Sequence, residues 1–296
     1  MNTLIRLLFL LLSRCPLPLL HALGWCLGWA SFVVSRRYRR RLLDNVRQAG
    51  FSRRVALASV GEAGKMVAEL PRLWLGPPVP VGWEGAAHIE AAQAHGAGVL
   101  YLTPHLGCFE ITAQVLAQRF GHTMPITVLY RPARQPWLRE LVAQARNRPG
   151  LQTAPTTLAG VKQLIKALKG GQAVGLLPDQ VPPVGQGVWA PFFGRDAYTM
   201  TLSARLVHSA RAQPVLIWGE RLSWGRGFLV HVRPFDPTNQ APLATDASLA
   251  ARQINQAMEA LVRECPRQYL WSYARYKQPP RAMAQDATPP ASAPAP

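Results

Sequence analysis

The feature that most constrains the fold is an alternation of short apolar runs with amphipathic segments, which continues from residue 99 to residue 263. Runs rich in strand-forming residues predict β-strands at 99–103, 126–130, 173–177, 215–219 and 228–232. Apolar residues at helical spacing predict helices at 109–120, 136–148, 157–169, 199–211 and 249–263. We therefore predict an α/β fold with a single mixed, mostly parallel central sheet flanked by helices.

Polar side chains collect where these predicted strands end. His105, Arg131 and Asp179 each follow a different strand. Ligands of such sheets bind at the carboxyl edge, where these side chains are expected to meet. We expect Asp179 to pair with Arg131 at this edge and to fix its position, and an ordinary structural ion pair between the two is the alternative.

His105 lies on a predicted strand-to-helix turn, because Pro104 and Gly107 interrupt the apolar pattern. Glu110 lies five residues further on, in the first turn of the next helix, and only a bend at Gly107 allows the two side chains to meet. A carboxylate that accepts from one ring nitrogen leaves the other nitrogen available as a general base. Taken alone, the pattern favours a structural interpretation, in which His105 caps the helix and Glu110 lies in solvent.

The first 35 residues form a separate apolar segment. Residues 17–34 carry no charged side chain and are just long enough to span a bilayer. Five arginines within residues 36–41 follow, and they favour a cytoplasmic location for the rest of the chain. Pro16 and Pro18 equally favour a pair of helices that lies in the membrane interface. Both alternatives predict an N-terminal membrane-anchoring helix that holds the chain at an anionic membrane surface.

The formal net charge of +18 indicates anionic partners. Lipid headgroups and acidic proteins fit this charge, and nucleic acid ranks last because the chain has no zinc-finger spacing and no recognisable RNA-binding motif. The four cysteines lie far apart, which indicates reduced thiols and neither a disulfide framework nor a metal site. Cys108 lies inside the His105 turn, but packing is favoured over a nucleophilic role because cysteine is so often buried.

Residues 181–198 are rich in Pro and Gly and yet contain several large apolar side chains. They predict a long loop that is too apolar to be disordered. We expect it, together with Gln180, to cover an acyl chain with Trp189, Phe192 and Phe193, and a loop that packs its own aromatic rings on the sheet is the alternative. From residue 278 onward the chain is rich in Pro and Ala and is predicted to be a disordered tail.

Five short motifs occur together in a fixed order: His105-Leu-Gly-Cys-Phe-Glu110, Tyr130-Arg131-Pro132, Pro178-Asp179-Gln180, Ala190-Pro-Phe-Phe-Gly194 and Tyr269-Leu-Trp-Ser-Tyr-Ala-Arg-Tyr-Lys277. In this order and spacing they make the chain resemble the bacterial lipid A biosynthesis acyltransferases. These are the late lauroyl and myristoyl transferases of the lysophospholipid acyltransferase superfamily. The resemblance covers an anchor at 1–35 and an acyltransferase domain at 36–277, and it excludes the tail at 278–296. Each motif alone is weak, but the five in register favour a catalytic His105.

The resemblance implies an O-acyltransferase on the cytoplasmic face of the bacterial inner membrane. It would move a fatty acyl chain from a thioester, carried by an acidic acyl carrier protein or by coenzyme A, to a hydroxyl of an anionic lipid acceptor, a lipid A precursor. His105 would deprotonate this hydroxyl, and Glu110 would orient the imidazole. Arg131 and the backbone N–H groups around Gly107 are the candidate donors to the oxyanion. No metal or redox cofactor is expected.

Three alternatives stay open at this point. The basic run expected near residues 148–155 is thin, with Arg146 and Arg148 just before or within it, which leaves room for a different lysolipid acceptor. A membrane-bound thioesterase or lipid hydrolase would use water in place of the acceptor, although the chain has no G-x-S-x-G motif. A non-enzymatic membrane scaffold would use the basic surface alone.

Overall fold

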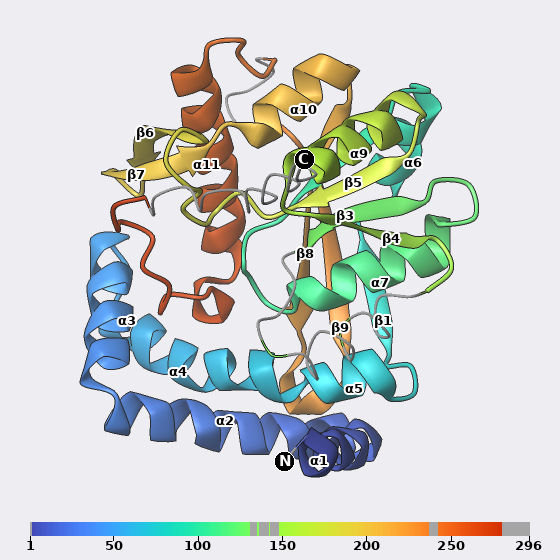
Figure 1. Ribbon diagram of the computed structural model, residues 1–296. Coiled ribbons are helices and arrows are strands. Elements are labelled where there is room, and N and C mark those ends of the chain that lie inside the picture. The colour runs from blue at the N-terminus through green and yellow to red at the C-terminus, as the bar shows by residue number, and fades with distance from the viewer. Residues whose placement is uncertain (1, 131–134, 136–141, 143–147, 237–241, 280–296) are drawn as a thin grey trace, which may run out of the picture.

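A seven-stranded sheet forms the centre of the computed structural model, which describes residues 2–130, 135, 142, 148–236 and 242–279 (Figure 1). The strand order is β1-β9-β8-β2-β5-β3-β4, and every neighbouring pair is parallel except β8 and β9. The strands are β1 (Val81–Glu84), β2 (Val99–Leu102), β3 (Ile126–Tyr130), β4 (Leu151–Pro155), β5 (Ala173–Leu176), β8 (Gln213–Arg221) and β9 (Phe228–Pro234). The predicted mixed, mostly parallel sheet is confirmed.

The two strands that the sequence pattern missed, β1 and β4, lie at the two edges of this sheet. Both contain exposed residues, whereas all four residues of the central strand β2 are buried. A strand that is covered on both faces has a continuous apolar run, and a short edge strand has a much weaker pattern. The five strands that were predicted therefore have a clearer apolar pattern than these two edge strands.

Helices cover both faces of the sheet, so the fold has three layers. Leu100 and Leu102 pack on one side in a core cluster with α4, α9 and α11, while Val99 and Tyr101 pack on the other side with α5, α6 and α7. The helices are α1 (Asn2–Arg14), α2 (Leu17–Val34), α3 (Arg36–Gln48), α4 (Arg53–Ala68), α5 (Leu70–Leu75), α6 (Ala87–Ala94), α7 (Phe109–Phe120), α9 (Leu158–Lys169), α10 (Leu202–Ala210) and α11 (Ala247–Glu264), with short 3₁₀ turns at Ser223–Gly225 and Pro266–Gln268. Most of the helix predicted at 136–148, and residues 280–296 of the predicted tail, lie outside the described residues.

The segment at 181–198, predicted to be a loop, contains a β-hairpin instead. In this hairpin β6 (Gly187–Phe192) pairs with β7 (Arg195–Met200) in antiparallel register. Phe193 and Gly194 form the turn, and both have the positive φ angles of a tight two-residue hairpin. The loop prediction is wrong because Pro191 and Gly187 mask the strand pattern, and β6 is stabilised by packing on α11.

The aromatic side chains of this hairpin have different environments. Phe192 and Phe193 are buried in the main core cluster, and the Phe193 ring lies 5.9 Å from that of Trp271. Trp189 is 45% exposed and contacts Tyr198. The core positions of Phe192 and Phe193 match the alternative in which the segment packs its own aromatic rings on the body of the protein.

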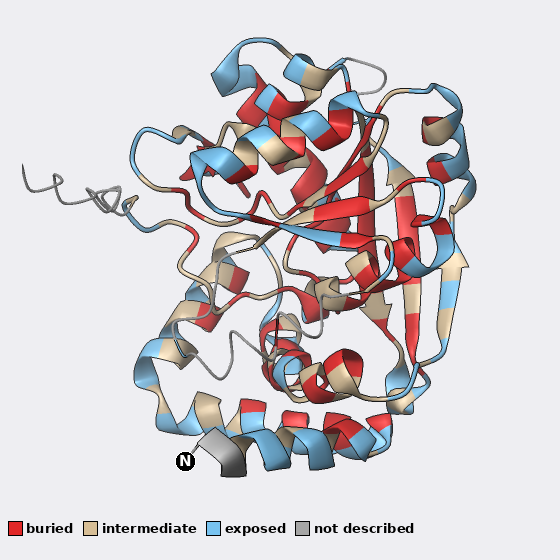
Figure 2. Cartoon of the chain, turned by 45° about the vertical axis from the view of Figure 1, so that its right-hand side comes forward, coloured by how far each residue is buried: buried red, intermediate tan, exposed pale blue. Residues whose placement is uncertain are grey.

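Helix α2 lies lengthwise along α4 at the lower edge of the molecule (Figure 1). The two helices meet through glycines, because a Cβ on Gly64 would overlap the carbonyl oxygen of Gly24, and one on Gly28 would overlap that of Val60. The other side of α4 contributes Ala56 and Val60 to the core. Helix α4 is thus enclosed between α2 and the body, while the outer side of α2 is exposed (Figure 2).

We expect Gly64→Ala to lower the free energy of unfolding by roughly 1–3 kcal/mol, because the new methyl group pushes α2 away from α4. This loss would occur although alanine is the better helix former. Thermal or chemical unfolding of the detergent-solubilised protein measures the effect. Gly170→Ala is the matched control, since a Cβ at Gly170 makes only ordinary contacts. Equal stability of the two variants would contradict the close packing of α2 on α4.

Candidate active site

His105 and Asp179 meet because they lie at equal distances along the chain beyond the ends of two neighbouring strands. Strands β2 and β5 are parallel neighbours, with Leu102 paired to Leu176 as the last residue of each. His105 and Asp179 each lie three residues beyond that pair. The Asp179 carboxylate accepts two hydrogen bonds from His105, one from ring Nδ1 at 2.7 Å and one from the backbone N–H at 2.9 Å. One carboxylate therefore fixes both the ring and the turn that carries it.

The Asp179 carboxylate is buried and ionised. Burial by itself would raise its pKa, but the neighbouring His105 with its two hydrogen bonds, together with Arg275, lowers the pKa below its ordinary value. An ionised carboxylate only accepts hydrogen bonds, so Nδ1 of His105 is the nitrogen that carries the proton. The other ring nitrogen, Nε2, then has a free lone pair in the neutral imidazole.

The Nε2 atom of His105 faces Gln180. The side-chain amide nitrogen of Gln180 lies 2.9 Å from Nε2 and donates to its lone pair. The ring of Phe109 packs edge-on against the imidazole, with 4.9 Å between ring centroids. The imidazole is thus held on three sides and presents an unprotonated nitrogen at the carboxyl edge of the sheet. This is the arrangement that a general base requires.

Glu110 was predicted to accept from a ring nitrogen of His105, and in the structure Asp179 occupies Nδ1. The Glu110 carboxylate, in the first turn of α7, accepts a hydrogen bond from the indole nitrogen of Trp74 at 3.2 Å. The predicted pairing of Asp179 with Arg131 falls partly outside the described residues, because Arg131 is not among them. The catalytic role of Glu110 and the oxyanion role of Arg131 stay predictions.

Gly107 supplies the bend that the sequence pattern requires. Its φ is +58°, and a Cβ at this position would overlap the carbonyl oxygen of Gly219. Its N–H, predicted as an oxyanion donor, donates to the carbonyl of Gln268 at 3.0 Å. Its own carbonyl accepts from Arg221 at 3.2 Å. In this structure the backbone of Gly107 is therefore engaged in holding the turn.

A buried ionic network lies directly behind this turn, and the sequence analysis did not identify it. Arg221, at the end of β8, donates to both carboxylate oxygens of Glu69, at 2.6 and 2.7 Å, and to Glu62 at 2.9 Å. His21 of α2 lies 3.2 Å from the same Glu69 carboxylate. The network thus joins α2, the α4–α5 junction and β8 to the turn at Gly107. Its only sequence signal is a charged residue at the end of an apolar strand.

Electrostatics within this network are strong because the groups are almost fully buried. Burial alone would raise the pKa of Glu69, but Arg221, with a smaller contribution from His21, lowers that pKa to about 2. Burial, with the charge of Glu69, raises the pKa of the Cys108 thiol well above its ordinary value. A thiol that stays protonated at neutral pH is a poor nucleophile, which supports the packing role of Cys108. None of the four cysteines forms a disulfide.

We expect part of the stability to be lost in acid. The pKa of Glu69 lies near 2 in the folded protein, against an ordinary value of 4.5, so its contribution of about 3 kcal/mol is fully present above pH 4.5 and is lost as the pH falls towards 2. The free energy of unfolding, measured between pH 7 and pH 3, should therefore fall less steeply in a Glu69→Met/Arg221→Met double variant. Parallel pH profiles would contradict the assignment.

The same double variant separates the effect of the Arg221–Glu69 pair on stability from its effect on the position of the Gly107 turn. Replacing both partners avoids the 3–5 kcal/mol cost of leaving one buried charge alone. The carbonyl of Gly107 still loses its donor, so we expect turnover to fall even where the variant folds as stably as the wild type.

The geometry of the site by itself indicates a class of protein. A histidine held by a buried carboxylate at the carboxyl edge of an α/β sheet, with its second nitrogen unprotonated, is typical of an enzyme that uses general-base catalysis. The sequence matches the family of bacterial lipid A biosynthesis acyltransferases over residues 4–278. The chain therefore belongs to this family of acyltransferases.

Curated relatives support the same assignment. The chain is 26% identical to the lipid A biosynthesis lauroyltransferase of Escherichia coli K12 over 288 residues, which cover 92% of this chain and 90% of the relative. It is 26% identical to the palmitoleoyltransferase of the same organism over 286 residues, which cover 90% and 88%. The myristoyltransferase is 26% identical over 191 residues, which cover 64% and 57%.

Proposed function

We propose that this enzyme transfers a fatty acyl chain from a thioester of acyl carrier protein or coenzyme A to a hydroxyl of a lipid A precursor, with His105 as general base. The lauroyl-, palmitoleoyl- and myristoyltransferase relatives support this acceptor class. The observation that carries the chemistry is the 2.7 Å contact between Nδ1 of His105 and the buried Asp179 carboxylate. It leaves Nε2 as the acceptor for a substrate proton.

The proposed reaction begins when the acceptor hydroxyl takes the place of the Gln180 amide at Nε2 of His105. Nε2 removes the hydroxyl proton as the oxygen attacks the thioester carbonyl, and Asp179 stabilises the imidazolium that forms. The tetrahedral intermediate then expels the thiolate, which takes the proton back from Nε2. The acyl group ends on the acceptor oxygen, and the histidine returns to its starting form. In this proposed reaction no metal or redox cofactor takes part, because the thioester supplies the leaving group.

The oxyanion of this intermediate requires hydrogen-bond donors near His105. We retain Arg131 as a candidate, and we add the N-terminus of α7, where the helix dipole favours negative charge. Helix α7 begins at Phe109, four residues after His105, and its capping residue Cys108 makes no side-chain hydrogen bond to it. Glu110 lies in this turn and is proposed to add negative charge beside the imidazolium.

We expect Asp179→Asn to lower kcat by roughly 10²- to 10⁴-fold, because an amide no longer selects the productive tautomer or stabilises the imidazolium. The KM values for both substrates should change little. Turnover of acyl carrier protein thioesters on lipid A precursor in micelles, with the lipid products resolved by mass, measures the effect. Asp196→Asn is the matched control, since Asp196 is exposed on the hairpin.

Two further outcomes of this assay are informative. If Glu110→Gln abolished transfer while Asp179→Asn matched the wild type, Glu110 would be the partner of His105, as the sequence pattern suggested. If the wild type released free fatty acid and formed no acylated lipid, the hydrolase alternative would replace the transferase.

We further propose that α1 and α2 lie in the interface on the cytoplasmic side of the bacterial inner membrane. Within the described residues, only α2 is long and apolar enough to span a bilayer, which by itself is weak evidence. Its inner side, however, carries the glycine contacts with α4 and the buried His21. A spanning α2 would bring α4, with Glu62 and Lys65, into the hydrocarbon layer at high cost.

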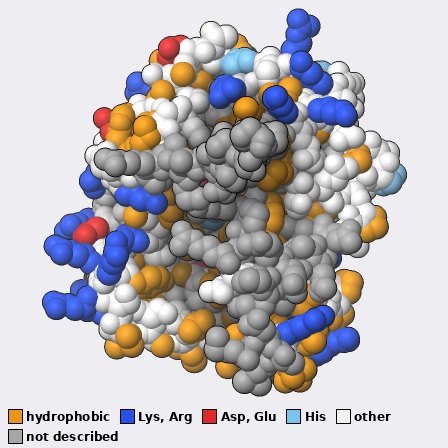
Figure 3. All heavy atoms as spheres, in the orientation of Figure 1, with side chains coloured by type: hydrophobic (Ala, Val, Ile, Leu, Met, Phe, Trp, Pro, Cys, Tyr) orange, Lys and Arg blue, Asp and Glu red, His pale blue; other side chains and the backbone are white. Residues whose placement is uncertain are grey.

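The outer surface of these two helices suits an interfacial position. Figure 3 shows hydrophobic side chains along the lower edge of the molecule, over α1 and α2. The exposed large apolar residues of the two helices are Leu7, Leu8, Leu10, Leu11, Leu19, Leu23, Trp25, Leu27, Val33 and Val34. A row of this kind, followed by the arginines of α3, is typical of helices that lie in the headgroup region.

An N-terminal epitope tag tests this orientation. If α2 lies in the interface, the tag and the body are on the same side of the membrane, so external protease should spare the tag in intact spheroplasts and remove it after lysis. A C-terminal tag serves as the control and should behave in the same way. Removal of the N-terminal tag alone from intact spheroplasts would establish a spanning α2.

A further inference from the structure

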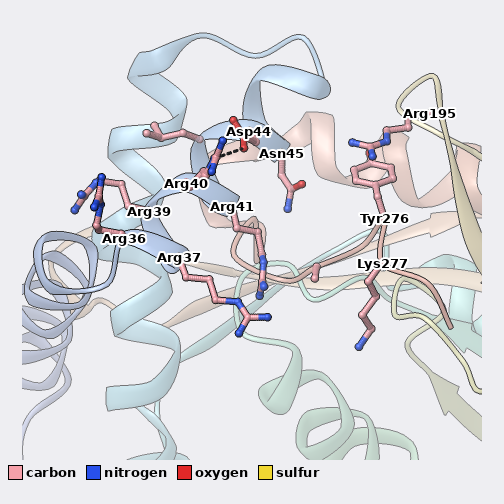
Figure 4. Close-up of a pocket in the computed structure, with 12 residues that line it drawn as sticks. Arg36, Arg37, Arg39, Arg40, Arg41, Asp44, Asn45, Arg195, Tyr276 and Lys277 are labelled. Atoms are coloured by element: carbon pink, nitrogen blue, oxygen red, sulfur yellow. Dashed lines mark ion pairs between the residues drawn. The ribbon is translucent and has the colours of Figure 1, made fainter. Parts of the chain in front are cut away.

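A strongly basic pocket lies between α3, the first residue of β7 and the segment 274–277 (Figure 4). Its volume is about 1100 Å³. Of the twelve described residues that line it, seven are Arg or Lys and one, Asp44, is acidic. Arg37 and Lys277 approach the same open space from different segments in Figure 4. The lining of the pocket therefore carries a large excess of positive charge, because its one carboxylate neutralises only one of the seven cations.

Contacts of the lining cations position them without removing their charge. Arg41 donates to the main-chain carbonyl of Ser272, Arg195 lies over the ring of Tyr276 at 4.7 Å, and Lys277 lies over the ring of Tyr273 at 5.2 Å. Carbonyls and aromatic faces orient a cation but carry no net negative charge. The pocket therefore keeps a strong attraction for an anion.

Hydrogen bonds connect the lining of this pocket to the active site. Asn45 of α3 donates to the main-chain carbonyls of Trp271 and Tyr273 and so holds the C-terminal segment in place. The Tyr273 hydroxyl accepts from the backbone N–H of Val181 at 3.0 Å. Val181 directly follows Gln180, which contacts Nε2 of His105. A ligand in the pocket would lie against the segment that is tied to the general base.

The pocket also lies close to the end of the apolar helix. Helix α3 begins two residues after Val34, the last residue of α2, and Arg39 donates to the carbonyls of Phe32 and Val33. With α2 in the membrane interface, the arginines of α3 lie at the level of lipid headgroups, where phosphate esters are found.

The basic residues expected to hold acceptor phosphates do not supply a second such site among the described residues. Arg148 donates to the main-chain carbonyls of Leu73 and Trp74, at 2.9 and 3.2 Å, and so stabilises the fold. Arg146 is not among the described residues. The pocket at α3, by contrast, is connected to the active site through Asn45, Tyr273 and Val181.

We infer that this pocket binds a phosphate ester on the headgroup of the lipid acceptor while the acceptor hydroxyl reaches His105. Guanidinium groups bind phosphate oxygens in a bidentate manner, and several around one cavity are suited to a phosphorylated sugar. A concave pocket of this size suits a small headgroup better than the convex surface of an acidic carrier protein. This inference rests on the proposed transferase function and extends it to recognition of the acceptor.

The test uses the full chain with Arg37→Gln and Lys277→Gln combined. We expect the KM for a phosphorylated lipid A precursor to rise about tenfold or more, because charge-assisted contacts to phosphate are lost. The kcat and the KM for the acyl donor should stay unchanged. The same acceptor with its phosphates removed enzymatically should bind the wild type and the double variant equally. Lys162→Gln/Lys166→Gln, on the exposed side of α9, removes the same charge and should match the wild type.

Several outcomes would overturn the inference. A rise in KM for acyl carrier protein thioesters, with none for coenzyme A thioesters, would assign the pocket to the carrier protein. An equal rise in the α9 control would indicate general attraction to anionic lipid, and an unchanged KM for the acceptor would exclude a role in binding it.

Binding of the phosphorylated and dephosphorylated acceptors to the His105→Ala protein is measured as well, because this measurement tests the pocket independently of acyl transfer. A wild type that binds the phosphorylated acceptor and does not acylate it would contradict the proposed reaction alone. A preference for the phosphorylated acceptor that survives Arg37→Gln/Lys277→Gln would contradict the pocket.

Discussion

The pairing of Arg221 with Glu69 is the interaction on which the arrangement of this enzyme depends. Both groups are almost completely buried, and each balances the charge of the other, which would be very costly to bury alone. Because Arg221 also donates to Gly107, the same guanidinium joins the helical layer to the turn that carries His105. Through His21 the network extends to α2, the most apolar of the described helices. The site and the proposed membrane surface therefore share one rigid support.

The active site follows from strand order as much as from residue identity. The carboxylate five residues after His105 is close in sequence, but the one that contacts the imidazole ring, Asp179, is 74 residues away. Asp179 reaches the ring because β5 is the neighbour of β2 and their last residues are paired. His105 and Asp179 lie the same number of residues beyond these strand ends, so their side chains meet. With this arrangement the sheet itself holds the proposed general base, and hydrogen bonds from the C-terminal segment fix the turn that carries it.

The proposed surface for lipid and the proposed pocket for phosphate belong to one continuous edge of the molecule. Helices α1 and α2 present apolar side chains outward, α3 presents arginines directly afterwards, and the C-terminal segment joins α3 to the loop beside His105. An amphiphilic acceptor has the same order of groups, with acyl chains, a phosphorylated headgroup and a reactive hydroxyl. The described structure therefore matches the polarity of the acceptor that the lipid A family assignment implies.

Sequence alone predicted the α/β class, five strands of the central sheet, the family resemblance and His105 as a candidate general base, because apolar periodicity and short motifs are local properties. It also singled out Asp179 and Gln180, though not as the partners of His105. Tertiary structure decided which carboxylate meets Nδ1, since neighbouring strands in a sheet are chosen by packing over the whole chain. It likewise decided the edge strands β1 and β4, the hairpin at Phe193-Gly194 and the buried Arg221 network. Each of these depends on contacts between residues far apart in sequence, which no local pattern records.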